Sequence, residues 1–256
     1  MNLHERSWPV DDPKACVVIV HGLAEHSGRY EYVARKLNEA GYAAHALDLR
    51  GHGRSPGFPG DMGTDVDAIS QDVTDLCVRL RPSYPALFLL AHSMGTLVSL
   101  PAVAKTPAGI LDGLILSGTA LVPGQAVLDS LTSGGPIPPE AISRDPEIVE
   151  AYRNDDLVFY DRVTMELTML AAEALGRASD AVPLITVPVL LVHGTEDTVT
   201  DMAGAQNVHT QLVITDKTFK GYDGLYHEVL NEPERDQVIA DIVAWLDERL
   251  PDRAPA

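Results

Sequence analysis

The chain has 256 residues, 45% of them hydrophobic, and its 37 acidic against 19 basic residues give a formal net charge of −18. That length and apolar content suit one substantial core with an insertion better than two separate domains. The negative charge argues against nucleic-acid binding and against a polybasic membrane anchor, because phosphate backbones and anionic bilayers would repel it.

The first ten residues carry His4, Glu5 and Arg6 and lack the apolar run of a secretory signal peptide. No stretch of about 18 apolar residues occurs, so no transmembrane helix is expected. Cys16 and Cys77 fall in a predicted strand and a predicted helix, without the spacing of metal ligands, and are expected to be reduced and buried. We therefore expect a cytoplasmic protein.

Short apolar runs alternate with amphipathic segments of helical length, which predicts an α/β fold with a mostly parallel sheet and helices on both faces. The predicted strands are residues 16–20, 43–47, 87–90, 113–116 and 189–192. The predicted helices are residues 30–40, 65–80, 94–104 and 235–250. Ligands of such sheets bind beyond the carboxyl ends of the strands. Candidate site residues should therefore follow these strands directly.

Residues 89–95 (LLAHSMG) are an apolar run that stops at Ser93, with Ala91 and Gly95 two positions away on either side. Small neighbours allow the sharp strand-to-helix turn of a nucleophile elbow, which exposes the serine hydroxyl above the sheet. The alternative is an ordinary serine at a helix N-cap, but a cap does not need small flanking residues. The pattern favours the nucleophile.

The alternation of strands and helices breaks between residues 121 and 183, where a segment rich in Gly and Pro leads into a helical region. We predict that 121–183 is an inserted cap and that 1–120 and 184–256 form the core. The apolar residues of this cap that could line an acyl channel are Leu157, Val158, Phe159, Val163 and Leu167. The alternative for each of them is that it packs the cap helices together.

An acid and a histidine that could activate Ser93 follow in the C-terminal third. Asp197 comes just after the strand 189–192, and His227 ends a later loop, so the chain order is Ser, Asp, His, as in α/β-hydrolases. Glu196 and Asp201 compete with Asp197, whose place directly after the strand favours it. Five further histidines lie in motifs before the acid and are expected to be structural hydrogen-bonding groups: His21, His26, His52, His92 and His193.

Five motifs in this order resemble the monoacylglycerol lipases and their esterase and lysophospholipase relatives in the α/β-hydrolase superfamily. They are residues 21–30 (HGLAEHSGRY), 48–55 (DLRGHGRS), 92–95 (HSMG), 194–197 (GTED) and 224–228 (GLYHE). Two positions depart from the family pattern: Ala91 replaces the more usual Gly, and Thr96 stands where a second Gly commonly follows Gly95. Charged residues in these motifs, such as Glu25, Asp48 and Arg54, are expected to have architectural roles.

The resemblance implies a serine carboxylic ester hydrolase that acts on monoacylglycerols. Ser93 would be the nucleophile, His227 the general base, and Asp197 the group that orients the imidazole. The backbone N–H groups of Leu23 and Met94 would form the oxyanion hole. Neither a metal nor an organic cofactor is expected.

Four alternative functions stay open: a lysophospholipase, a short-chain carboxylesterase, a serine hydrolase that cleaves C–C bonds and, outside enzymes, a small-molecule receptor on the hydrolase fold. The expected partner is a lipid ester or another small-molecule ester, with no nucleic acid. The apolar rim of the cap would permit weak peripheral contact with a lipid interface.

Overall fold

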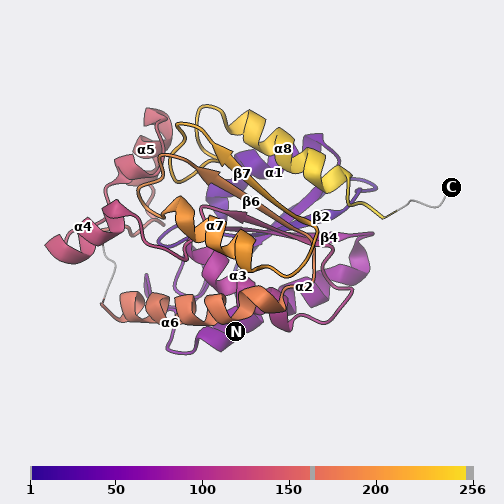
Figure 1. Ribbon diagram of the computed structural model, residues 1–256, viewed down its shortest axis with the longest axis horizontal. Coiled ribbons are helices and arrows are strands. Elements are labelled where there is room, and N and C mark those ends of the chain that lie inside the picture. Colours follow the sequence, from indigo (N-terminus) through magenta and orange to yellow (C-terminus); the bar gives the residue numbers. More distant parts are fainter. Residues whose placement is uncertain (1, 162–164, 252–256) are drawn as a thin grey trace.

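The computed structural model describes residues 2–161 and 165–251, and a seven-stranded sheet runs through its middle (Figure 1). Its strands follow the order β1-β3-β2-β4-β5-β6-β7. They are β1 (Glu5–Trp8), β2 (Cys16–Val20), β3 (Ala43–Leu47), β4 (Leu87–His92), β5 (Gly113–Ser117), β6 (Val189–Gly194) and β7 (Lys217–Tyr222). β1 runs antiparallel to β3, and the other recorded pairs are parallel. The mostly parallel α/β sheet is confirmed.

The five predicted strands are all present, and β2 and β3 begin and end at the predicted residues. The other three extend one or two residues beyond the prediction. Helices cover both faces of the central strands, so these strands consist of continuous apolar runs that sequence reading can find. The edge strands β1 and β7 were not predicted, because their side chains alternate between exposed and half-buried positions and include several charges.

Eight α-helices are formed by the described residues, and they include the four predicted from the sequence. They are α1 (Glu31–Glu39), α2 (Val66–Leu80), α3 (Met94–Lys105), α4 (Gln125–Ser133), α5 (Pro146–Arg153), α6 (Met165–Ala181), α7 (Met202–Gln211) and α8 (Arg235–Asp247). α1 and α8 cover one face of the sheet, and α2, α3 and α7 cover the other (Figure 1). The fold is thus a three-layer α/β sandwich.

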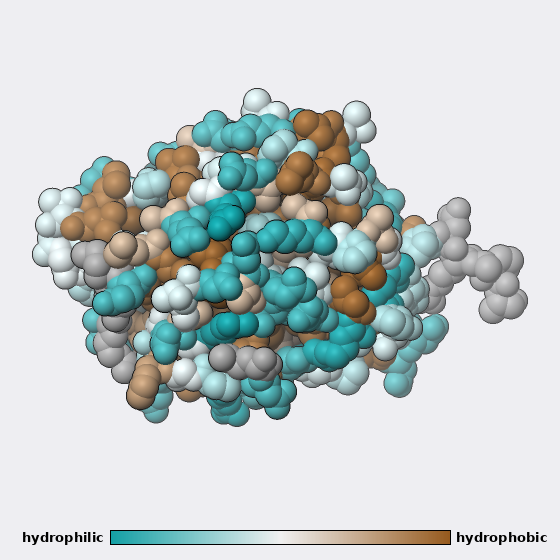
Figure 2. Space-filling model, turned by 90° about the horizontal axis from the view of Figure 1, so that it is seen from below, coloured by the Kyte–Doolittle hydropathy of each residue, from teal (hydrophilic) through white to brown (hydrophobic). Residues whose placement is uncertain are grey.

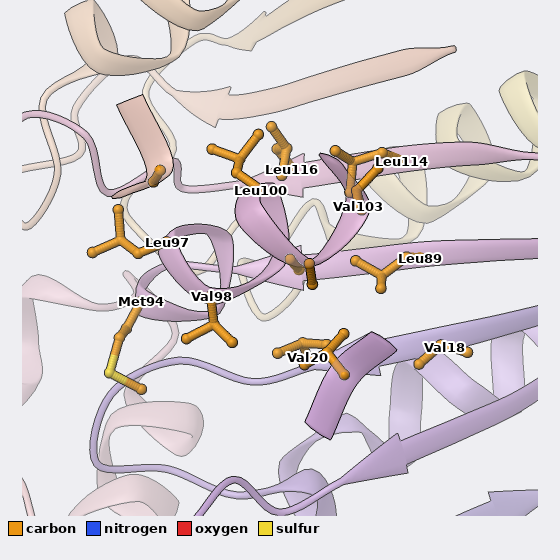
Figure 3. Packing of buried hydrophobic residues seen from close by; sticks show 14 of the residues in the cluster. Val18, Val20, Leu89, Met94, Leu97, Val98, Leu100, Val103, Leu114 and Leu116 are labelled. Atoms are coloured by element: carbon orange, nitrogen blue, oxygen red, sulfur yellow. The ribbon is translucent and has the colours of Figure 1, made fainter. Parts of the chain in front are cut away.

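Helix α3 begins directly after β4 and lies across the middle of the sheet. Its apolar side chains pack over residues of β2, β4 and β5 (Figure 3). The α3 side chains in this contact include Leu97, Val98, Leu100 and Val103. This packing holds the start of α3, and with it the residue before the helix, against the carboxyl ends of the central strands.

The predicted cap, residues 121–183, has two parts in the structure. Helices α4 and α5 lie at one end of the molecule (Figure 1). Helix α6 instead runs beside α3 and buries Leu167, Leu170 and Ala174 in the main apolar cluster. The second half of the segment therefore belongs to the packing of the body, while the division into a core and a cap stays a prediction.

The strand order reverses between β2 and β4. From β2 the sheet continues to β3 on one side, and from β4 it continues to β5, β6 and β7 on the other. Such a reversal of strand order is the point where α/β sheets bind ligands. The loop after β2 carries Leu23, and the turn after β4 carries Ser93.

None of the helices in the described ranges combines the length and the apolar composition that a membrane span needs. Cys16 and Cys77 are both buried and unbridged, as expected from their places in β2 and α2.

Candidate active site

Ser93 occupies the strained turn between β4 and α3. Its backbone has φ +52° and ψ −125°, a region that residues other than glycine rarely adopt. The turn is held by the Ser93 N–H, which donates to the carbonyl oxygen of Ser117 at 2.9 Å. Gly95 is required in this turn, because a Cβ there would lie 2.5 Å from the His21 carbonyl oxygen. Ser93 makes no side-chain cap to the helix, so its hydroxyl is available for another partner.

That partner is His227. The Ser93 hydroxyl lies 2.9 Å from Nε2 of His227, and Nδ1 of the same ring lies 2.8 Å from Oδ2 of Asp197. The carboxylate accepts a hydrogen bond from the Nδ1–H group, which leaves Nε2 free to accept one from the serine hydroxyl. The competing acids lie elsewhere: Glu196 is exposed, and Asp201 caps α7 by accepting from Ala203 N–H.

The carboxylate of Asp197 is buried among hydrogen-bond donors. Its Oδ1 accepts from the backbone N–H groups of Val199 and Thr200, at 2.8 and 2.9 Å, and its Oδ2 accepts from the Thr200 hydroxyl at 2.8 Å. Nε2 of His193 lies 3.1 Å from the same oxygen. Burial alone would raise the pKa of Asp197, but His227 and His193 outweigh it and lower the pKa. The acid therefore stays ionised.

The ionised acid acts on the imidazole of His227. Burial of the ring favours its neutral form, but the charge and the hydrogen bond of Asp197 more than offset this and raise the pKa of His227. The His92 ring lies 4.7 Å from the His227 ring, centroid to centroid. Burial and the neighbouring His227 lower the pKa of His92 to about 4. His92 is therefore neutral near pH 7.

The loop after β2 and the start of α3 present two backbone donors. Within the described residues, the N–H groups of Leu23 and Met94 have no recorded backbone or side-chain acceptor. Met94 is the first residue of α3, where an N–H lacks an intrahelical partner and the helix dipole favours negative charge. Both groups suit an oxyanion.

Two neutral histidines hold the loop that carries Leu23. Nε2 of His21 accepts from the Leu49 N–H at 2.9 Å, and Nε2 of His52 accepts from the Ala24 N–H at 3.2 Å. Burial lowers the pKa of His21 to about 4 and that of His52 to about 3. Neutral rings are needed here, because a protonated Nε2 could not accept these bonds. The structural roles expected for both histidines fit this arrangement.

A buried ion cluster also holds the loop that carries Leu23. Glu25 accepts from the Gly22 N–H at 2.6 Å and from Arg29 at 2.8 Å. Arg29 also makes two bonds of 2.7 Å to Glu228, the residue after His227. The guanidinium thus joins the loop after β2 to the loop of the histidine. Asp48 has the loop-tying role expected of it, accepting from the N–H groups of Ser27 and Arg54.

Comparison with known families fits this geometry. The family described as serine aminopeptidase, S33 (Hydrolase_4), matches residues 11–234. The chain belongs to this family.

Individual relatives of this S33-family hydrolase cover nearly its whole length. A monoacylglycerol lipase of Mycolicibacterium smegmatis is 36% identical over 93% of this chain and 90% of its own. Phospholipase YtpA of Bacillus subtilis is 28% identical over 94% of this chain and 98% of its own. The crystal structure of Paleococcus ferrophilus monoacylglycerol lipase matches with a TM-score of 0.84 and 31% identity, covering 97% of this chain and 100% of that one. The resemblance to monoacylglycerol lipases is confirmed.

The predicted cap residues of the S33-family hydrolase lie in different surroundings. The Phe159 ring lies 4.9 Å from the His52 ring, and the Phe159 N–H donates to the Ala24 carbonyl at 3.1 Å. Phe159 is therefore next to the loop of Leu23. Leu157 and Phe159 line a cavity of about 150 Å³ between segments 51–59 and 156–159. Leu167 joins the main cluster.

Val158 belongs to a different cluster. It packs with Ile142, Val149 and Tyr152 in a small cluster around α5. Val163 lies outside the described residues. The contact of any of these residues with an acyl chain stays a prediction.

Sequence reading did not identify Thr200, Thr96 or Arg29 as parts of the site. Thr200 carried a weak signal, since Asp side chains commonly accept from groups two and three residues later. The bond of Thr96 to Ala120 and the bonds of Arg29 to Glu228 depend on how distant segments meet, and no local pattern reveals them.

Proposed function

We propose that this chain is a carboxylic ester hydrolase that cleaves monoacylglycerols into a fatty acid and glycerol. The observation that carries this proposal is the continuous line from the Ser93 hydroxyl through His227 to Asp197, with distances of 2.9 and 2.8 Å. Ser93 lies at a strained elbow, and the N–H groups of Leu23 and Met94 have no acceptor among the described residues. Relatives named monoacylglycerol lipases, similar over more than nine-tenths of this chain, support the substrate class.

In this mechanism Ser93 Oγ attacks the ester carbonyl carbon while Nε2 of His227 takes its proton. The negative charge that develops on the carbonyl oxygen is met by the N–H groups of Leu23 and Met94. His227 then gives the proton to the departing glycerol oxygen, which leaves an acyl group on Ser93. A water molecule repeats the attack with His227 as base, and the fatty acid is released.

The surface near the predicted cap supports a lipid substrate. Helix α4 has no buried residue, and its Leu128 and Leu131 are 43% and 59% exposed. Figure 2 shows hydrophobic side chains gathered at the end of the molecule that carries α4. Exposed apolar side chains of this kind favour contact with a lipid interface. A cytoplasmic enzyme whose cap, residues 121–183, touches such an interface is part of this proposal.

The test is hydrolysis by the purified chain of a panel of monoacylglycerols and p-nitrophenyl esters of increasing acyl length. Wild-type protein should act best on medium or long monoacyl esters, and Ser93→Ala should lose several orders of magnitude in kcat. Ser83→Ala, at an exposed serine outside the predicted cap, is the matched control and should keep full activity. Wild-type turnover no faster than that of Ser93→Ala would refute the proposal.

The same panel separates the alternatives. The similarity to phospholipase YtpA makes a lysophospholipid the second candidate substrate, so lysophosphatidylcholine belongs in the panel. Activity confined to acetate and butyrate esters would indicate a short-chain carboxylesterase. Cleavage of aminoacyl p-nitroanilides in preference to esters would follow the family description instead. Tight ligand binding without product release would indicate a receptor.

A further inference from the structure

The Thr96 side chain is fully buried on the first turn of α3, three residues after the elbow serine. Its hydroxyl donates to the Ser93 carbonyl oxygen at 2.6 Å and accepts from the Ala120 N–H at 3.1 Å. The Thr96 backbone N–H donates to the same Ser93 carbonyl at 2.8 Å. One carbonyl thus receives two donors from a single residue.

The Ser93 carbonyl and the Met94 N–H belong to one peptide unit. A peptide unit is planar and trans, so its C=O and N–H point in opposite directions. Two hydrogen bonds that fix the carbonyl therefore also fix the direction of the N–H. In this site that N–H is one of the two donors that face the developing oxyanion.

The hydrogen bonds to the Ser93 carbonyl also make the Met94 N–H a stronger donor. Donors that bind an amide oxygen draw electron density from the amide, and hydrogen bonds in such a chain reinforce one another at low dielectric. Thr96 is 0% exposed, so water does not compete for the hydrogen bonds of its hydroxyl. The Met94 N–H should therefore be a better donor with the hydroxyl than without it.

The other bond of the hydroxyl reaches the segment beside the catalytic histidine. Ala120 follows β5 by three residues, and between them Gly118 packs on His227 so closely that a Cβ would lie 2.9 Å from Cε1 of the ring. Thr96 therefore links the elbow peptide to the segment that supports the imidazole.

We propose that the Thr96 hydroxyl is a positioning group that aims and polarises the Met94 N–H for the oxyanion, an inference that rests on the proposed function. A glycine, which commonly stands here in the family that the motifs resemble, offers no such hydroxyl. Thr96 thus gives this chain an additional support of the transition state.

The experiment compares Thr96→Val, which keeps the shape and loses the hydroxyl, with Thr96→Ser, which keeps the hydroxyl. We expect Thr96→Val to lower kcat on a p-nitrophenyl ester by roughly 3- to 10-fold, the value of one net hydrogen bond, with KM nearly unchanged. Thr96→Ser should stay within about twofold of wild type, since it preserves that bond.

A trifluoromethyl ketone gives the readout that a purely structural role would not move, because its adduct with Ser93 carries an oxyanion. Its inhibition constant should rise in Thr96→Val by the same factor by which kcat/KM falls. An unchanged inhibition constant, or equal kcat values for Thr96→Val and Thr96→Ser, would overturn the inference. A larger loss in Thr96→Ser than in Thr96→Val would do so too, since the methyl group, which only Thr96→Ser removes, would then be responsible.

Folding is checked by circular dichroism and thermal unfolding. Thr96→Val leaves the Ala120 N–H buried without an acceptor, which lowers stability. If it does not fold, Thr96→Ala, which leaves room for water at that N–H, is compared with Thr96→Ser by the same criteria. A wild-type protein without ester hydrolysis would refute the proposed function and this inference together, whereas an active enzyme indifferent to the hydroxyl would refute the inference alone.

Discussion

The raised pKa of His227 has a direct consequence for activity. The imidazole can take the serine proton only in its neutral form, so kcat/KM must fall as the pH drops through the pKa of the free enzyme. Asp197, Glu228 and Glu25 all raise this pKa, against the effect of burial. We expect the acid limb of the kcat/KM profile to have its midpoint above 6.5, the ordinary value for histidine.

Asp197→Asn tests the source of that shift. Removing the carboxylate charge should move the acid limb to lower pH and reduce kcat by about 10⁴-fold, because the imidazole also loses its orienting acceptor. Glu196→Gln removes an exposed charge from the adjacent position and should leave the profile as it is. An acid limb that stays in place in Asp197→Asn would mean that Asp197 does not set the pKa of His227.

Single residues were predictable where a local pattern carries the chemistry. Ser93, Asp197 and His227 each follow an apolar strand or a glycine-containing loop, and the structure brings the three together. Thr96 stands out in the sequence only as a departure from the family pattern. Its hydroxyl bond to the Ser93 carbonyl is local, but the bond from the Ala120 N–H depends on where residue 120 lies, which no pattern around residue 96 encodes.

At the scale of elements, the close contact of α3 with the end of β2 determines the position of the elbow. A Cβ on Gly95 would lie 2.5 and 2.6 Å from the carbonyl oxygens of His21 and Val20, both backbone atoms that cannot move aside. We expect Gly95→Ala to lower the free energy of unfolding by about 1–3 kcal/mol, as overpacking does, and to reduce kcat. Urea unfolding and ester hydrolysis measure the two effects.

Gly176 in α6 is the matched control. It is exposed, and a Cβ there would meet no atom within 4 Å. Gly176→Ala should raise the free energy of unfolding by up to about 1 kcal/mol, because alanine favours the helix more than glycine does. If both substitutions changed the free energy of unfolding equally, the close approach of α3 to β2 would not account for the effect of Gly95→Ala.

The elements found from the sequence and those missed differ in burial. Strands β2 to β6 are buried along their length and consist of apolar runs, and α2 begins where the Asp65 side chain caps it. The edge strand β7 (KTFKGY) has a single buried residue, so it carries no such run. Edge strands form because a neighbouring strand pairs with them, and that partner is distant in the sequence.

At the scale of the whole molecule, one buried cation joins segments that are far apart along the chain. Arg29 binds Glu25 and Glu228, and its guanidinium lies 4.6 Å from the Tyr152 ring of α5. Only about 10% of the Arg29 side chain is exposed. The loop after β2, the loop of His227 and the predicted cap thus all contact this one side chain.

Arg29→Leu should leave two buried carboxylates without their counter-ion. The expected loss is about 3–5 kcal/mol in the free energy of unfolding at pH 8, as when one partner of a buried ion pair is removed. In the wild type, burial would raise the pKa of Glu228, but Arg29 outweighs it and lowers the pKa to about 2 from 4.5. The stability that ionised Glu228 contributes is complete above pH 4.5 and is lost as the pH falls towards 2.

In Arg29→Leu the shift of the Glu228 pKa changes sign, because burial acts without the arginine and raises the pKa. Protonation at acid pH then relieves the buried charge. The difference between wild type and variant should therefore be smaller at pH 5 than at pH 8, measured by urea unfolding. Lys105→Leu removes the same charge from an ion pair with Asp67 whose side chains are 52% and 44% exposed. That control should change stability little at either pH, because solvent screens exposed pairs. A loss in Arg29→Leu no larger than the control's, or one independent of pH, would mean that the buried cluster does not hold these segments together.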